Sequence, residues 1–278
     1  MEFNLRKAAQ EKILIAAHRG ASGGNIPCNT IPAYELALRQ GADMIEIDVA
    51  LSKDGVPFIF HPGMERAHLG FNGSLSNMYA SDIRNLRYVN YDLTPTQFPI
   101  HTLDEVLERF KGRCYINVDK FGDHPEIIAR RLRAYDMTDQ ILIKTGASDY
   151  HFDHIERFAP EIPYMVVTWD EAGSVHEQLL KRNINYIGQE LLFSDENSYI
   201  CSREYINRLK SDNILAWVNA IVYNYLTVLS AGHSDDMAIL GNMENSWGWL
   251  AKRGFDIIQT DWTGMLNEYL TANGLKYR

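Results

Sequence analysis

The sequence is poor in cysteine, in long apolar runs and in clustered basic charge. Its three cysteines, in 278 residues and with no spacing typical of a zinc site, do not form a disulfide framework. No apolar segment approaches the roughly 20 residues that a membrane-spanning helix needs. The formal net charge of −9 and the lack of a basic run argue against nucleic acid as a partner. We therefore expect a cytoplasmic protein with a small-molecule ligand; a removed export signal and the oligomeric state stay open.

What the chain does have is an alternation of short apolar runs and amphipathic segments. Hydrophobic residues make up 46% of it, enough for a large core. Eight apolar runs predict strands, at residues 13–18, 44–49, 114–119, 141–144, 164–169, 185–190, 214–219 and 256–261. Helical patterns lie between them, at residues 30–40, 102–110, 124–135, 152–158, 174–182, 202–210 and 246–254. Eightfold alternation is typical of a (β/α)₈ TIM barrel, whereas a doubly wound sheet, the main alternative, usually has fewer units.

One stretch interrupts the alternation. Residues 62 to about 99 follow the second strand without a helical or strand pattern that fits the repeat. Because excursions from the carboxyl end of a barrel commonly shape its substrate pocket, we expect this insertion to cover the site. We thus predict a single TIM-barrel domain over residues 1–278 with an insertion at about 62–99.

The segment MIEIDVALSKDGVPFIFH, residues 44–61, concentrates polar groups in an apolar setting. Side chains two residues apart in a strand share a face, so Glu46 and Asp48 point the same way and repel each other unless a cation lies between them. Asp54-Gly55 predicts a two-residue hairpin turn. That register places Asp48 opposite His61, and so brings a histidine beside the paired carboxylates.

Polar residues also end almost every other predicted strand. Since the carboxyl ends of barrel strands build the active site, these residues are expected to meet there. Hard oxygen ligands from Glu46, Asp48 and Asp119 suit one divalent cation, Mg²⁺ or Ca²⁺. The other candidates are the acid/base pair His18 and His61, and the phosphate- or substrate-binding residues Arg19, Lys144, Glu190 and Asn219. A metal, two histidines and cations together suit the cleavage of a phosphodiester.

Three motifs resemble the glycerophosphodiester phosphodiesterase family. They read HRGASGGNIPCNTIPAYELAL, GADMIEIDVALSKDGVPFIFH and DIIQTDW, with the strongest likeness between residues 18 and 61. The resemblance implies a TIM barrel with a small insertion and hydrolysis of glycerophosphodiesters to an alcohol and glycerol 3-phosphate with a divalent cation. It also implies that the glycerol hydroxyl is the nucleophile and forms a cyclic phosphate that water opens.

The resemblance assigns roles by position. His18 and His61 match the catalytic acid/base pair, and Arg19 matches a phosphate-contacting arginine. Glu46 and Asp48 match two metal ligands, and Asp119 stands where a glutamate is usual as the third ligand.

The chain also departs from the family pattern. Cys28 replaces the glutamate of P-E-N-T, Pro62 replaces an aspartate, and Phe121 replaces a lysine. These changes keep other hypotheses open: a lysophospholipase D-like or phosphoinositide-type phosphodiesterase, a metal-dependent sugar isomerase or epimerase, and a barrel that binds a glycerophosphodiester without turnover.

Overall fold

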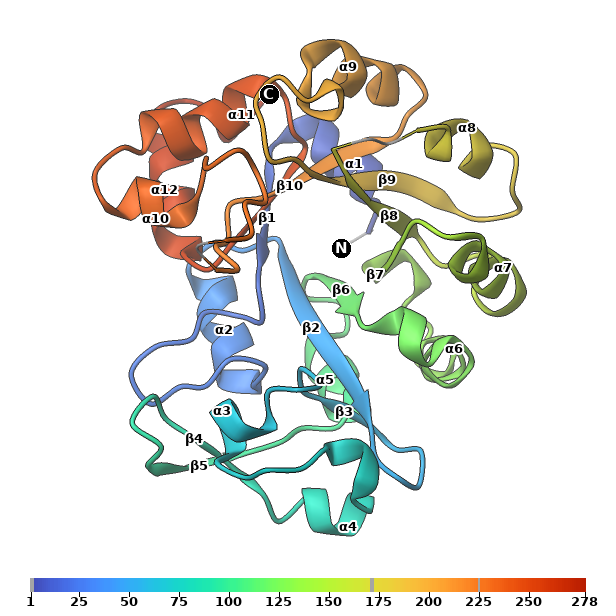
Figure 1. The fold of residues 1–278 in the computed structure, drawn as a ribbon, viewed down its shortest axis with the longest axis vertical. Coiled ribbons are helices and arrows are strands. Elements are labelled where there is room, and N and C mark those ends of the chain that lie inside the picture. The colour runs from blue at the N-terminus through green and yellow to red at the C-terminus, as the bar shows by residue number, and fades with distance from the viewer. Residues whose placement is uncertain (1–2, 171–172, 225) are drawn as a thin grey trace.

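The eight predicted strands form a closed parallel barrel (Figure 1). The structure, a computed structural model, describes residues 3–170, 173–224 and 226–278. Around the barrel each strand pairs with the next in the order β1, β2, β6, β7, β8, β9, β10 and β11, and β11 pairs again with β1. The barrel strands are β1 (Leu14–Ala17), β2 (Met44–Leu51), β6 (Tyr115–Asp119), β7 (Ile141–Gly146), β8 (Tyr164–Trp169), β9 (Tyr186–Leu192), β10 (Leu215–Asn219) and β11 (Ile257–Thr260). The TIM-barrel prediction is confirmed.

Helices surround the barrel and follow most strands (Figure 1). The helices that match predicted segments are α2 (Ile31–Arg39), α5 (Leu103–Phe110), α6 (Pro125–Ala134), α7 (Asp149–Phe158), α8 (Val175–Leu179), α9 (Arg203–Ser211) and α11 (Trp249–Arg253). A π-helical turn at Glu244–Gly248 leads into α11. The sequence patterns did not predict α1 (Leu5–Glu11), α10 (Asp235–Ile239) and α12 (Thr263–Ala272).

The barrel interior is apolar at one end and polar at the other. Inner-facing residues such as Leu14, Met44 and Trp217 form one buried cluster, and Leu5 and Ala9 of α1 pack against it from the amino ends of the strands. Helix α1 therefore closes this end of the barrel. Because side chains alternate along a strand, residues two or four positions farther on face the interior at the carboxyl end.

The hairpin after β2 differs from its prediction by one residue. Strand β3 (Pro57–Ile59) runs antiparallel to β2, and the Phe60 amide donates to the Asp48 carbonyl at 3.0 Å. Asp48 therefore lies opposite Phe60, and the predicted pairing with His61 is wrong. The loop has three residues, 53–55, and Gly55 takes a φ of +80°. A left-handed third residue is the usual way to close such a loop, which explains the shifted register.

The insertion packs as a small unit beside the barrel, in cyan and teal at the bottom of the view (Figure 1). It contains α3 (Glu65–Leu69), α4 (Ala80–Ile83) and the antiparallel pair β4 (Arg87–Val89) and β5 (Pro95–Pro99). Its buried residues Leu69, Ile83 and Tyr88 form a cluster with Phe58 and Phe60 of the hairpin arm, separate from the main core. Within the described residues, no helix is both long and apolar enough to cross a membrane.

Candidate active site

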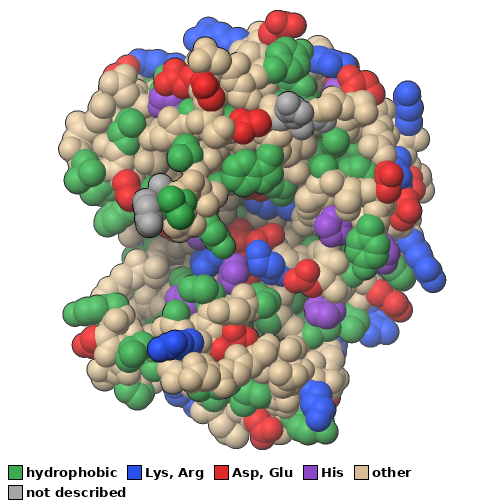
Figure 2. Space-filling model, viewed as in Figure 1, with side chains coloured by type: hydrophobic (Ala, Val, Ile, Leu, Met, Phe, Trp, Pro, Cys, Tyr) green, Lys and Arg blue, Asp and Glu red, His purple; other side chains and the backbone are tan. Residues whose placement is uncertain are grey.

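The carboxyl ends of the strands surround a cavity of about 360 Å³. Figure 2 shows the hollow, with acidic, basic and histidine side chains gathered at its bottom. Eight of the nine predicted site residues line it: His18, Arg19, Glu46, His61, Asp119, Lys144, Glu190 and Asn219. None of the lining residues comes from 62–99, so the insertion does not line this cavity, and its role as a cover stays a prediction.

The ninth residue, Asp48, completes a cluster of three carboxylates. One oxygen each of Glu46, Asp48 and Asp119 lies within 4.8 Å of the others. The strand register explains this closeness, since Glu46 and Asp48 share the inner face of β2 and Asp48 pairs directly with Asp119 of β6. Glu46 and Asp48 are 2% and 0% exposed.

This cluster fits a divalent cation. Among the described residues, the buried Asp48 Oδ1 has no hydrogen-bond partner, which is costly for a carboxylate oxygen. Burial and the neighbouring charge of Asp48 raise the pKa of Glu46 to about 8. A divalent cation bound by the three carboxylates would pair with this oxygen and would lower the raised pKa of Glu46.

Arg19 and Asn29, both in the segment that follows β1, hold the carboxylates in place. The Arg19 amide donates to Glu46 Oε2 at 2.8 Å, and the Arg19 Nε lies 3.0 Å from Asp48 Oδ2. Asn29 Nδ2 donates to the same Asp48 oxygen at 2.8 Å, and Tyr34 donates its hydroxyl proton to Asn29 Oδ1. The sequence analysis did not predict a role for Asn29, although the P-C-N-T motif keeps this residue of P-E-N-T.

His18 is held by the carboxylate of Asp261, the residue directly after β11. Its Nδ1 lies 2.8 Å from Asp261 Oδ1, so Nδ1 carries a proton and Nε2 is left for the cavity. Burial alone would lower the pKa of His18, but the hydrogen bond with Asp261 and the charges of Glu46 and Asp261 outweigh it and raise the pKa. Asp261 is the last residue of the predicted strand at 256–261, but the sequence did not predict it as a partner of His18.

His61 has the opposite electrostatic surroundings. Its Nδ1 lies 2.8 Å from the Pro62 carbonyl oxygen, which can only accept, so the ring proton sits on Nδ1 and Nε2 keeps a lone pair. Burial and the positive charges of Arg19 and Lys120 lower the pKa of His61, against the opposing charge of Asp48. The pKa values of the two histidines are thus shifted in opposite directions, so that His18 favours the charged form and His61 the neutral form.

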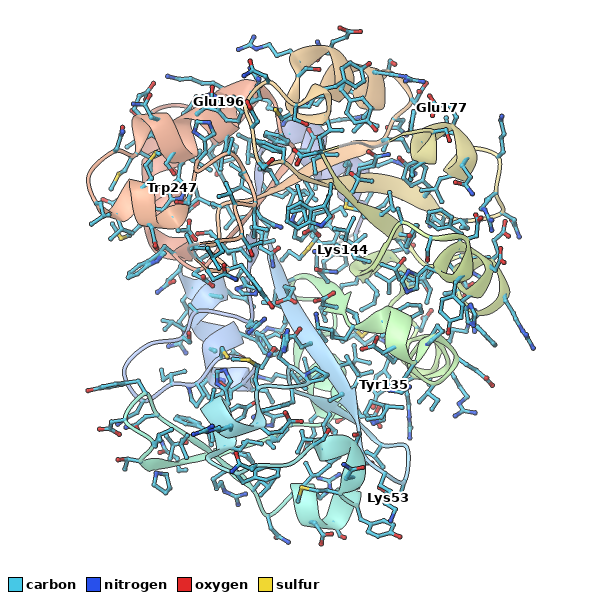
Figure 3. All side chains as sticks on the ribbon, viewed as in Figure 1. Lys53, Tyr135, Lys144, Glu177, Glu196 and Trp247 are labelled. Atoms are coloured by element: carbon cyan, nitrogen blue, oxygen red, sulfur yellow. The ribbon has the colours of Figure 1, made fainter. Side chains whose placement is uncertain are left out.

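Lys144, Glu190 and Asn219 form the floor of the cavity. Lys144 Nζ donates to Glu190 Oε2 at 2.6 Å, and Asn219 Nδ2 donates to Glu190 Oε1 at 2.6 Å. Lys144 also lies 4.0 Å from the ring centre of Trp217, in the middle of the barrel (Figure 3). The structure brings all three predicted residues together, but Lys144 is paired with Glu190 and is only 5% exposed.

Comparison with known proteins identifies the family. The family model for the glycerophosphoryl diester phosphodiesterase family matches residues 18–265. The chain belongs to this family. A glycerophosphodiester phosphodiesterase of Bacillus altitudinis is 29% identical over 169 residues, 56% of this chain and 66% of that protein. One of Caldanaerobacter subterraneus is 26% identical over 159 residues, 54% of this chain and 65% of that protein.

Solved structures share the fold over nearly the whole chain. A glycerophosphoryl diester phosphodiesterase from Parabacteroides distasonis matches with a TM-score of 0.77 at 17% identity, covering 97% of this chain and 92% of that one. An Oleispira antarctica phosphodiesterase, solved with its product sn-glycerol-3-phosphate, matches with a TM-score of 0.67 at 18% identity, covering 94% and 97%. At these identities the likeness establishes the fold.

Lys120 supplies a positive charge near the position where the family usually has a lysine and this chain has Phe121. Phe121 stands at the position of the usual lysine and is fully buried. Lys120, with a φ of +58°, turns its side chain to the cavity instead. Its Nζ lies 3.0 Å from Asp119 Oδ2 and 4.0 Å from Asp48 Oδ1. Burial alone would lower the pKa of Lys120, but these carboxylates raise it, so the group stays charged.

Proposed function

We propose that this protein hydrolyses glycerophosphodiesters to an alcohol and glycerol 3-phosphate, with one divalent cation, Mg²⁺ or Ca²⁺. The observation that carries the proposal is the arrangement at one end of the barrel, where a three-carboxylate cluster and two histidines with opposite pKa shifts come together. Membership of the family and the relatives' activity support it.

The carboxylate cluster is the proposed metal site. Glu46, Asp48 and Asp119 would hold the cation, and Asn29 and Arg19 would keep Asp48 in its orientation. When bound, a divalent cation supplies positive charge that neutralises the phosphate oxygens. Arg19 and Lys120 add two fixed positive charges from the protein on the same side of the cavity.

The two histidines divide the proton transfers. His61, neutral with a free Nε2 lone pair, takes the proton from the glycerol hydroxyl as its oxygen bonds to phosphorus. The bond from phosphorus to the alcohol oxygen breaks, and His18 gives its Nε2 proton to that oxygen as the alcohol leaves. Water then opens the cyclic phosphate with the roles reversed: His18 accepts a proton from water, and His61 returns one to the glycerol oxygen.

The floor residues act indirectly. Glu190 accepts from both Lys144 and Asn219, so the Lys144 charge is neutralised and the floor keeps its shape. We propose that these three residues support the phosphate site. The direct contacts to the phosphate are made by Arg19 and Lys120. This division differs from the sequence-based expectation that Lys144 holds the phosphate.

The first test is release of glycerol 3-phosphate from glycerophosphocholine by chelator-treated protein, with and without Mg²⁺ or Ca²⁺. We expect turnover only with metal. Glu46→Gln should lower it by at least about a hundredfold and weaken metal binding measured by calorimetry, because one ligand charge is lost. Turnover that survives chelation, or a Glu46→Gln variant that binds metal as well as the wild type, contradicts the proposal.

A matched control separates this loss from a general effect of losing a buried carboxylate. Glu65 of α3 is 3% exposed and accepts from the Leu75 amide at 3.1 Å within the insertion. Glu65→Gln should destabilise the insertion but leave the affinity for metal unchanged.

A further inference from the structure

The site cavity has one ionic side and one apolar side. The ends of β1, β2 and β6 supply the charged groups already described. The opposite side is formed by the ends of β8 and β9 and the segment after β10, through Val167, Trp169, Leu192, Ile221, Tyr223 and Leu229. Figure 2 shows hydrophobic side chains along the upper edge of the hollow, above the charged groups at its bottom.

The apolar side continues into a second cavity. This cavity, of about 190 Å³, shares Asn219, Ile221, Thr227 and Leu229 with the site cavity. The two spaces therefore adjoin along the segment after β10. Val222 and Val228 add apolar surface to the second cavity, whose remaining lining is polar, with Asp236 as its one carboxylate among the described residues.

Apolar side chains in this region are unusually exposed. Trp169 and Tyr223 are 47% and 64% exposed, and Val222 and Val228 are each 39% exposed. Grouped exposure of large apolar side chains at the edge of a polar cavity marks a place where apolar ligand surface is buried.

The position of the phosphate decides which part of a substrate meets this side. If the phosphate lies against the carboxylate cluster and Arg19, one of its two ester substituents points away from the ionic side toward Leu192 and Leu229. Glu190, the carboxylate lining the cavity near there, is already paired with Lys144 and Asn219. Among the described residues that line the apolar side of the site cavity, a cationic substituent thus finds no free carboxylate, whereas an alkyl group finds a continuous surface.

We infer that the preferred substrate is an amphiphilic glycerophosphodiester whose alcohol carries an alkyl or similarly apolar group. This inference rests on the proposed function and narrows its substrate class. The ionic side recognises the glycerophosphate, and the apolar side removes the alcohol's hydrocarbon from water. Each buried methylene should raise kcat/KM by about fourfold, or about 0.8 kcal/mol at 1.36 kcal/mol per factor of ten.

The test compares glycerophosphocholine with its neutral isostere, the glycerophosphoryl ester of 3,3-dimethylbutanol, and adds the ethyl, butyl and hexyl esters. We expect the isostere to exceed the choline ester in kcat/KM by about threefold or more, and the alkyl series to rise by about fourfold per methylene. Tyr223→Asp and Leu229→Asn should reduce the slope of that series. Preference for the choline ester with a flat alkyl series would overturn the inference, because aromatic side chains would then be binding a cation.

Tyr277 offers a control for the loss of an exposed tyrosine. It is 70% exposed and pairs through its backbone with Lys12, at the amino ends of the strands. Tyr277→Asp should leave the whole substrate series unchanged. An equal loss of slope in this variant would overturn the assignment to the apolar side.

Failure of the proposed function gives a different result. If no ester is hydrolysed with either metal, the proposed function fails, and calorimetry of the same esters with metal-loaded wild-type protein decides the inference. Affinity that rises along the alkyl series supports the apolar side as a binding surface, and equal affinity for all esters overturns it.

Discussion

At the scale of single residues, Asp235 stands out because it links the position of His18 to the rest of the fold. Its carboxylate accepts from Thr260 Oγ1, Trp247 Nε1 and the Asp261 amide, each at 2.8 Å. Asp261 in turn holds His18 Nδ1. Burial raises the pKa of Asp235 to about 6, although these three donors act in the opposite direction. Asp235 is thus a positioning residue for His18.

Replacing Asp235 by asparagine tests this link. An amide nitrogen cannot accept, so at least one of the three donors loses its partner and Asp261 should shift. We expect kcat/KM to fall by about tenfold and the pKa of His18, read from the pH–rate profile or by NMR, to move down. The unfolding free energy should fall by about 1–3 kcal/mol.

The pKa of His18 separates positioning from a general loss of stability. Asp139→Asn removes an exposed carboxylate just before β7, at the other end of the barrel, and should change neither quantity. If Asp235→Asn lowers stability but leaves the pKa of His18 unmoved, the proposed link is wrong.

The sequence predicted the site residues on inner-facing strand positions and, from its motifs, Arg19, but it did not predict Lys120 and Asn29, which lie in loops. Glu46 and Asp48 follow from alternation along one strand. Lys120 and Asn29, with φ values of +58° and +55°, reach the site through left-handed backbone that these residue types do not specify. Their roles depend on where the loops are held by the rest of the protein.

At the scale of elements, Glu35 joins α2 to the end of α5. Its Oε1 accepts from Arg109 Nε and Arg113 Nη1, both at 2.7 Å, and Oε2 accepts from Arg113 Nη2 at 2.9 Å. The hydrogen bonds from Arg113 and Arg109 lower the pKa of Glu35 to about 2, against a smaller opposing effect of burial. This network ties the helix after β1 to the helix before β6.

The sign of this shift gives a pH dependence of stability. Because the folded-state pKa lies below the unfolded value of about 4.3, Glu35 stabilises the fold above that pH and loses this effect as the pH falls toward 2. Glu35→Gln should lower the unfolding free energy at pH 7 by about 1 kcal/mol, and the difference should shrink between pH 4 and pH 3. Urea unfolding of both proteins across this range measures it.

Glu268 of α12 is exposed and provides the control. Glu268→Gln should leave the urea midpoint at pH 7 nearly unchanged. A Glu35→Gln effect that stays constant from pH 7 to pH 3 would show that the stabilisation does not come from the ionised carboxylate.

Strands were more predictable than helices in this chain for a physical reason. Parallel barrel strands are buried on both faces and read as mainly apolar runs; all eight residues of β2 are buried, and only Glu46 and Asp48 among them are charged. Helix α5 has a capping box formed by Thr102 and Glu105, which its sequence predicts, whereas Trp262, the residue before α12, makes no side-chain cap. The hairpin register depended on loop geometry, which Asp54-Gly55 alone did not determine.

At the scale of the whole molecule, the barrel separates stability from chemistry. The amino ends of the strands are closed by α1 over an apolar cluster, and the carboxyl ends carry the charged groups. The electrostatic repulsion among the three carboxylates arises at the carboxyl end only, where Arg19, Lys120 and the proposed cation offset it. This polarity is why the sequence could predict the site as a set of strand ends before any contact was known.

In the proposed mechanism His61 acts as the base and His18 as the acid in the first step. The most direct test measures the single-turnover rate of alcohol release, which reports the first step alone, for His18→Ala and His61→Ala. The substrates are glycerophosphocholine and the p-nitrophenyl ester, whose leaving group departs without a proton. On the choline ester both variants should lose about 10²–10⁴-fold. On the p-nitrophenyl ester His18→Ala should stay within about tenfold of the wild type, while His61→Ala keeps its full loss. Rescue of His61→Ala instead, or of neither variant, would contradict the claim.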